Sequence, residues 1–190
     1  AQQFPFATDS THLTVWNGER YTPLFIKGVN LGIAKPGTFP GELLADEQDY
    51  LRWFSYIREA GFNTIRLYTL HFPQFYSALK KFNIEHKNSP ILVFHGVWLE
   101  EEHADFTEDL YGLTQVFDKE IIDNIQAIHG DITISERQGK AYGSYTTDIS
   151  EWVIAYIIGR EIHPPEVEAT NAEHAEITSF SGNYFSISDT

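Results

Sequence analysis

Residues 152–161 read Trp-Val-Ile-Ala-Tyr-Ile-Ile-Gly-Arg-Glu, an apolar run that ends in a glycine, a cation and an acid. The continuous apolar stretch Trp152–Ile158 predicts a strand of a parallel sheet, because such strands are covered on both faces. Glu161 follows the C-terminal end of this strand. Folds that alternate strands and helices carry out their chemistry at that edge of the sheet, so Glu161 is a candidate proton donor.

The sequence before this strand alternates between strand patterns and helix patterns. Three further strands are expected at Phe25–Asn30, Phe62–Leu70 and Pro90–Leu99. Three helices are expected between the strands, at Asp46–Ala60, Pro73–Phe82 and Leu110–His129. Alternation of this kind predicts parallel strands that are joined by right-handed crossovers.

The expected helices carry start and stop signals. Asp46, with Asp49 three residues later, resembles a capping box, and Gly61 ends that helix. Pro73 suits the first turn of the second helix, and Gly130 suits the end of the third. The third helix is expected to bury one apolar side, formed by Leu113, Val116, Phe117, Ile121, Ile125 and Ile128.

Outside the strand-helix units, we expect one hairpin and otherwise irregular segments. His12–Trp16 alternates in polarity, Asn17-Gly18 is a strong turn pair and Tyr21–Phe25 returns, which together predict an N-terminal hairpin. Residues 131–150 are polar and suggest no further strand or helix, and residues from Pro164 onward are expected to be irregular.

These elements predict an α/β fold, a parallel (β/α) barrel of TIM type. A unit of about 30–40 residues suits an eight-fold barrel of roughly 250 residues. Only the first four strands and three helices are present, which makes a half barrel. We divide the chain into the N-terminal hairpin (1–24), the half barrel (25–162) and an irregular segment (163–190). Because a half barrel leaves strand edges unpaired, we expect either self-association or a missing C-terminal half.

Composition narrows the function classes. Of the 190 residues, 42% are hydrophobic and 15% aromatic, which is typical of a folded globular protein. The formal net charge of −14 disfavours nucleic acids and anionic membrane surfaces as partners, whereas a neutral glycan fits. No run of 18 apolar residues predicts a membrane span. The chain starts at Ala1 without Met, which fits removal of a signal peptide or a trimmed chain, and we expect a secreted, extracellular or periplasmic protein.

Three segments carry a resemblance to a known family. Leu24–Asn30 is similar to the entry strand of glycoside hydrolase family 2 barrels, and Phe62–Tyr68 resembles their second strand. Gly159-Arg160-Glu161 lies where that family has Gly-Asn-Glu. The resemblance extends from about Leu13 to Glu161, and the order and spacing of these short motifs carry it. The chain therefore resembles the N-terminal half of a clan A glycosidase barrel.

The resemblance implies a role for individual residues. It makes Glu161 the general acid/base, Arg66 a supporting residue near the nucleophile, and His71 a substrate-contacting histidine. The family's nucleophile ends a seventh strand, so no residue here takes that role. Arg160 stands where the family has an asparagine that contacts the sugar 2-hydroxyl, and this departure bears on substrate preference and catalysis. The expected substrate-binding residues are Arg66, Tyr68, His71, Trp98 and Arg160.

The residues themselves leave alternatives open. Glu161 is either the protonated member of the carboxyl pair that retaining glycosidases hold roughly 5 Å apart, or an ordinary carboxylate paired with an arginine. Strand alternation sends Arg160 away from it. Arg66, between apolar neighbours, either orients a catalytic carboxylate or forms a structural ion pair. Tyr68, His71 and Trp98 lie at or just past the C-terminal ends of strands and form either a sugar-binding rim or ordinary packing.

We therefore expect a carbohydrate-active protein, a retaining β-glycoside hydrolase with a glycan substrate. The alternative is a non-catalytic scaffold, derived from such a barrel, that binds glycans or assembles with other copies. Glu100-Glu101-Glu102-His103 is interpreted as a solvated loop, since consecutive residues rarely converge on one ion. No metal and no cofactor are expected.

Overall fold

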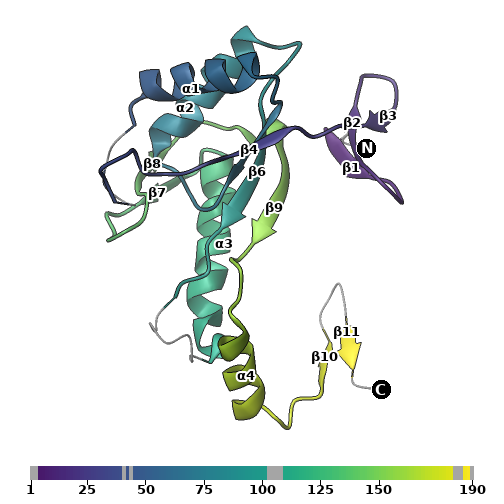
Figure 1. Cartoon of the computed structure of the whole chain (residues 1–190), viewed down its shortest axis with the longest axis vertical. Coiled ribbons are helices and arrows are strands. Elements are labelled where there is room, and N and C mark those ends of the chain that lie inside the picture. Colours follow the sequence, from purple (N-terminus) through teal and green to yellow (C-terminus); the bar gives the residue numbers. More distant parts are fainter. Residues whose placement is uncertain (1–3, 40–41, 43–44, 102–108, 182–185, 189–190) are drawn as a thin grey trace.

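A computed structural model describes residues 4–39, 42, 45–101, 109–181 and 186–188 of the chain. Within these residues, the centre of the molecule is a four-stranded sheet with the order β4-β5-β6-β9, in which every pairing is parallel (Figure 1). Its strands are β4 (Gly28–Leu31), β5 (Thr64–Leu67), β6 (Leu92–Val97) and β9 (Val153–Ile158). The expected parallel α/β arrangement is confirmed, and the sheet formed by these residues does not close into a barrel.

Helices connect the strands of this sheet. The helices of the described residues are α1 (Glu47–Glu59), α2 (Pro73–Glu85), α3 (Thr114–Ile128) and α4 (Pro164–Glu173), with short 3-10 turns at Leu110–Leu113 and Ser150–Trp152. α1 follows β4, α2 follows β5 and α3 follows β6. Each of these helices carries the chain back from the end of one parallel strand toward the start of the next.

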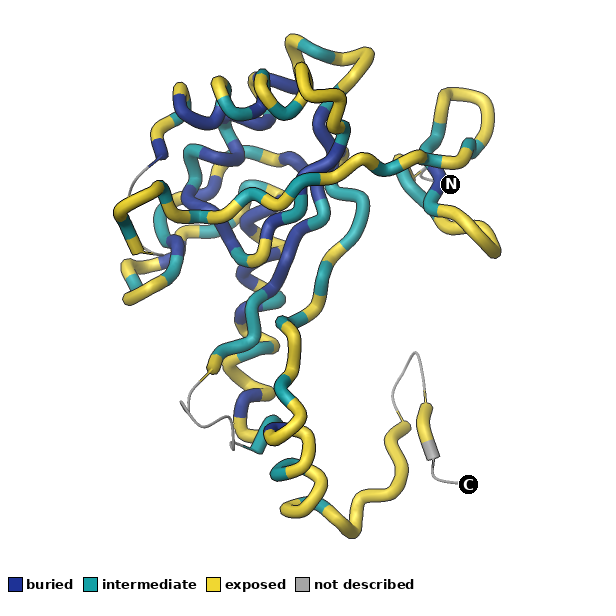
Figure 2. Tube along the Cα trace, viewed as in Figure 1, coloured by how far each residue is buried: buried dark blue, intermediate teal, exposed yellow. Residues whose placement is uncertain are grey.

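The core lies between the sheet and the first two helices, where Figure 2 shows most of the buried chain. Ile65, Leu67 and Val93 of the central strands are completely shielded from water. Aromatic rings from the helices cover them, and Tyr50 of α1 meets Phe75 of α2 edge to face at 5.5 Å between centroids. Edge-to-face pairs add about 0.5–1.5 kcal/mol to the burial of the rings. The strand ends therefore rest on a well-packed base.

The start signals of the helices are confirmed. The Asp46 carboxylate accepts a hydrogen bond from the backbone N–H of Asp49 at 2.8 Å, and the Asp49 carboxylate accepts one from the Asp46 N–H. Lys35 and Arg52 donate to the same Asp49 carboxylate, and these two cations hold its pKa near 2. Pro73 begins α2, where its missing N–H costs no helical hydrogen bond.

The N-terminal hairpin is confirmed and contains an additional strand. β2 (Leu13–Trp16) pairs with β3 (Tyr21–Pro23) across the Asn17-Gly18 turn, and β1 (Phe6–Thr8) pairs with the other side of β2. Figure 1 shows this small antiparallel sheet standing apart from the parallel one.

The predicted buried side of α3 is partly wrong. Val116 and Ile125 are 50% and 40% exposed, whereas the buried positions of the helix include Glu120, Asp123 and Asn124. The carboxylate of Glu120 is buried because cations from another segment, described next, neutralise it. Hydrophobic periodicity does not register a carboxylate that is paired in this way.

The polar segment 131–150 contains a hairpin that was not expected. β7 (Ile132–Ile134) and β8 (Gly143–Tyr145) pair antiparallel, and β7 contacts α3 while β8 contacts α2. Arg137, between the two strands, holds Glu120 with two hydrogen bonds of 2.7 and 3.2 Å. The hairpin thereby covers the polar side of α3.

The expectation of an irregular segment after residue 163 is also wrong. α4 begins at Pro164, and the carboxylate of Glu166 accepts a hydrogen bond from the His163 backbone N–H at 2.8 Å. β10 (Ser179–Ser181) and β11 (Ser186–Ser188) form a further hairpin, which lies away from the parallel sheet (Figure 1). A proline start preceded by a polar residue signals a helix, and α4 follows that rule.

We predict that Gly130→Ala destabilises the protein by about 1–2 kcal/mol more than Gly139→Ala does. Both glycines have a left-handed φ, of +71° and +72°, so alanine costs a similar backbone strain at each. At Gly130 a Cβ would also lie 2.6 Å from the backbone nitrogen of Thr147, whereas at Gly139 nothing lies within 4 Å. Urea unfolding of the two variants measures the difference, and equal losses would contradict the close approach.

Candidate functional site

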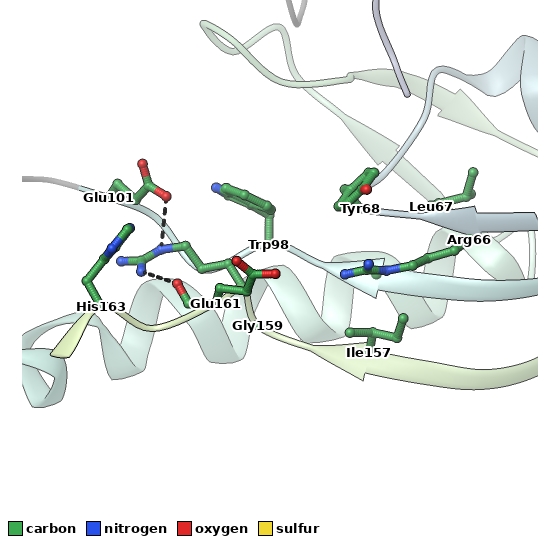
Figure 3. A pocket seen from close by; sticks show the side chains of 11 residues that line it. Arg66, Leu67, Tyr68, Trp98, Glu101, Ile157, Gly159, Glu161 and His163 are labelled. Carbon is green, nitrogen blue, oxygen red and sulfur yellow. Dashed lines mark hydrogen bonds and ion pairs between the residues drawn. The ribbon is translucent and has the colours of Figure 1, made fainter. Parts of the chain in front are cut away.

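A pocket of about 210 Å³ opens at the C-terminal edge of the parallel sheet (Figure 3). We call it the Glu161 pocket. It is lined by Arg66, Leu67, Tyr68, Gly96, Trp98, Glu101, Ile157, Gly159, Arg160, Glu161 and His163. These residues come from the ends of β5, β6 and β9 and from the segments that follow them. Parallel strands end at one edge, which is why residues far apart in sequence meet here.

Glu161 lies three residues beyond the end of β9 and is exposed. Gly159, with a φ of +84°, turns the chain immediately after the strand. Figure 3 shows the Glu161 carboxylate directed into the pocket, beside Trp98. Among the described residues, no hydrogen bond or ion pair engages this carboxylate. It is therefore an acid that is free to contact a ligand.

Arg66 on β5 faces the same pocket from the opposite side, with its guanidinium directed toward Glu161 (Figure 3). Its Nε is buried and has no hydrogen-bond partner in the described part of the chain. The guanidinium carbon lies 4.5 Å from the centre of the Tyr68 ring, a cation–π contact. No carboxylate of the described residues is paired with Arg66, so the structural ion pair that the sequence left open is not formed by them. The site presents a cation to whatever occupies the pocket.

Tyr68 and Trp98 supply the aromatic wall of the Glu161 pocket. Tyr68 is 38% exposed and Trp98 is partly exposed, so both rings offer a face to a ligand. Between these strand ends, a Cβ on Gly96 would lie 2.4 Å from the carbonyl oxygen of Leu67. Glycine at this position therefore lets β6 approach β5 closely beneath the two rings.

Arg160 lines the pocket, but its guanidinium is committed to the protein. The side chain is 1% exposed and forms a paired contact with Glu166, in which one hydrogen bond measures 2.8 Å. It also donates to the carbonyl oxygens of Leu99 and Glu100, each at 3.1 Å. The hydrogen bonds that the Glu166 carboxylate accepts from Arg160 are the main cause that lowers the pKa of Glu166 to about 2. These contacts give Arg160 a structural role, because they tie the segment after β6 to α4. The substrate contact expected from the sequence stays a prediction.

His71 does not line the Glu161 pocket. Its ring is completely buried, and Nδ1 lies 3.1 Å from the hydroxyl of Tyr50. His71 instead lines a second cavity of about 540 Å³. We call this cavity the hairpin pocket. It is lined by Leu31, Gly32, Ile33, Ala34, Tyr68, Thr69, His71, Trp98, Glu100, Gln138, Gly139 and Lys140.

The structure thus brings most of the predicted site residues together. Arg66, Tyr68, Trp98, Arg160 and Glu161 all line the Glu161 pocket. Sequence reasoning missed the tip of the β7–β8 hairpin. A Gln-Gly turn between two short alternating segments was the available signal for it.

The acidic loop after β6 is described only in part. Glu100 and Glu101 lie within the described residues, whereas Glu102 and His103 lie outside them. Glu101 is 3.4 Å from the Nε of Arg160. In the described part of the chain, no cluster of three or more histidine, aspartate or glutamate side chains is arranged to hold a metal ion.

We predict that stability falls as the pH drops below about 6.5. Burial is the main cause that lowers the pKa of His71 to about 3 and that of His95 to about 4. Between these values and 6.5, the unfolded chain binds a proton at each histidine and the folded chain does not. Each histidine therefore lowers the free energy of unfolding by about 1.4 kcal/mol per pH unit over that range.

Urea unfolding at pH 7, 6 and 5 measures this slope. His95→Gln should be less stable at pH 7, because the Tyr76 hydroxyl loses its 2.8 Å contact with Nε2, but its slope should be about half as steep. His12→Gln, on the exposed N-terminal hairpin, is the control and should keep the full slope. An unchanged slope in His95→Gln would contradict the assignment.

No helix in the described part of the chain has the length and apolar character needed to cross a membrane. Comparison of the chain with protein-family models, with curated proteins and with solved structures gives no match. The two pockets are therefore the features of the molecule that bear on its function.

Proposed function

We propose that the protein is carbohydrate-active and acts as a retaining β-glycoside hydrolase, with Glu161 as general acid/base. The observation that carries this proposal is the convergence of Glu161, Arg66, Tyr68 and Trp98 on one pocket at the C-terminal edge of a parallel sheet. The resemblance of the strand motifs to family 2 glycosidases supports the same reaction.

The lining of the pocket suits a sugar. The apolar C–H faces of a pyranose ring stack on aromatic side chains, and Tyr68 is exposed and Trp98 partly exposed for such stacking. Polar groups at the rim fix orientation in ligand pockets, and Arg66 and Glu161 are placed to bond hydroxyl groups. A neutral substrate is compatible with the net charge of −14.

In the proposed reaction Glu161 protonates the oxygen of the leaving sugar and later takes a proton from the attacking water. Retention also requires a carboxylate nucleophile roughly 5 Å away on the other side of the bond. We assign no residue of this chain to that role. Arg66, which is unpaired among the described residues, is suited to hold that carboxylate in its ionised form.

We also infer that the parallel sheet is the first half of a TIM-type barrel. β4 and β9 are the outer strands of the described sheet, and barrel closure would add further strands to them. Those strands come from the same protein or from a second copy. A secreted, extracellular or periplasmic location fits an enzyme that acts on polysaccharides.

The alternative function is a non-catalytic scaffold that binds glycans or assembles with other copies. Two observations favour it. Arg160 replaces the expected asparagine and is bound to Glu166, and Glu161 is exposed where a general acid is usually shielded from water.

Incubation with a panel of β-linked oligosaccharides tests the proposal. We expect release of new reducing ends, and proton NMR of the first product should show the β-anomer. Release of the α-anomer would remove the retaining mechanism. Binding without cleavage would remove the hydrolase and leave the non-catalytic alternative.

A further inference from the structure

The hairpin pocket lies directly beside the Glu161 pocket. Tyr68 and Trp98 line both cavities, so the two rings form a shared wall. At about 540 Å³ the hairpin pocket is the larger, and it falls within the range of about 300–1,000 Å³ that is common for small-molecule sites. A ligand in the Glu161 pocket can therefore extend past the rings into a second cavity.

The outer wall of the hairpin pocket is the tip of the β7–β8 hairpin, Gln138–Lys140. Hydrogen bonds and ion pairs to the rest of the protein hold this tip in place. Arg137 donates to the Ala141 carbonyl at 2.8 Å and to the buried carboxylate of Glu120, and Lys140 is paired with Glu100 and with Glu120. A wall anchored by ion pairs to a buried carboxylate is in place before a ligand arrives, which lowers the entropic cost of binding.

The chemistry of the lining is mostly apolar, with a few polar groups. Leu31, Ile33 and Ala34 supply apolar lining from the end of β4 and the residues that follow it. The Gln138 side chain makes no hydrogen bond with the described residues. His71 also lines the cavity and is completely buried.

The charges in the hairpin pocket are balanced. Lys140 is neutralised by its two glutamate partners, so the cavity presents no free charge from this residue. Apolar surface and the unbonded Gln138 amide suit a neutral, hydroxyl-rich ligand.

We propose that the hairpin pocket is a second glycan subsite, so that the ligand is an oligosaccharide chain crossing the Tyr68–Trp98 wall and not a single sugar. This proposal rests on the proposed carbohydrate function and extends it. The β7–β8 hairpin then determines how many sugar units contribute to binding.

Calorimetric titration with β-linked gluco-, manno- and galacto-oligosaccharides of one to five units tests the subsite. We expect the best-bound series to gain about 10-fold or more in affinity between the shortest and longest members. Ala34→Trp, which fills the hairpin pocket without touching the Glu161 pocket, should remove that gain and leave the affinity of the single sugar unchanged. Ala172→Trp, on the exposed side of α4, is the matched control and should retain the gain.

The outcomes separate the two proposals. Length-dependent binding without cleavage would support the subsite and remove the hydrolase. Cleavage with the same affinity at every length would keep the hydrolase and overturn the subsite. The subsite would also be overturned if Ala34→Trp kept the gain in affinity with oligosaccharide length, or if no member of the panel bound.

Discussion

Replacing Glu161 with glutamine is expected to lower kcat on a β-linked oligosaccharide by about 10²–10⁴-fold, the usual contribution of a general acid/base. Glutamine keeps the size of the side chain but has no proton to transfer. Because Glu161 is exposed and its carboxylate makes no hydrogen bond or ion pair with the described residues, its replacement should leave the thermal midpoint unchanged. The measurement is the rate of reducing-end release in the intact protein, together with a melting curve.

A change of leaving group distinguishes proton donation from a loss of binding. A dinitrophenyl glycoside needs no protonation to depart, so its first step should be slowed far less by Glu161→Gln than that of a natural glycan. Glu173→Gln removes the same charge from an exposed position of α4 and should retain full activity. If Glu161→Gln cleaves natural glycans at the normal rate, Glu161 is not the acid.

Glu166→Gln is expected to lower the free energy of unfolding by about 3 kcal/mol, the lower end of the range for breaking a buried ion pair. The Arg160 and Glu166 side chains are 1% and 0% exposed, so the variant leaves the guanidinium buried without its counter-charge. We take the lower end because α4 projects from the body of the molecule (Figure 1). Urea unfolding measures the loss.

The pH dependence of this pair adds a second readout. The pKa of Glu166 is lowered to about 2 from an ordinary 4.5, so the folded chain keeps the carboxylate ionised where the unfolded chain protonates it. The resulting stability is present in full above pH 4.5 and is lost as the pH falls toward 2. Glu166→Gln should lack this loss of stability at low pH. Glu168→Gln, exposed on the same helix, should keep it. A stable Glu166→Gln protein would contradict the structural role of Arg160.

Sequence alone predicted those elements that depend on near neighbours. The Asn17-Gly18 turn and the Asp46 cap involve contacts within a few residues, and both are present. The parallel order of the sheet followed from the alternation of strand and helix. The clustering of Arg66, Trp98 and Glu161 followed in turn, since parallel strands end at one edge.

Contacts between distant polar residues account for the elements that were missed. Glu120 is buried on α3 because Arg137 and Lys140 reach it from a hairpin 17 and 20 residues later. The β7–β8 hairpin and the buried side of α3 therefore cannot be predicted separately, because each depends on the ion pairs that join them. The ion pair of Arg160 with Glu166 was likewise missed, because Glu166 belongs to a helix that was not expected from the sequence.

The insertion of the β7–β8 hairpin also affects how the sheet is made. Val93 of β6 pairs with Val153 of β9, 60 residues later, whereas Ile65 of β5 pairs with Val93 only 28 residues later. A ribosome adding about 5–20 residues per second needs about 3–12 seconds to deliver the partner of β6. For that time the nascent chain carries an apolar strand with a free edge, a template for aggregation that chaperones must shield.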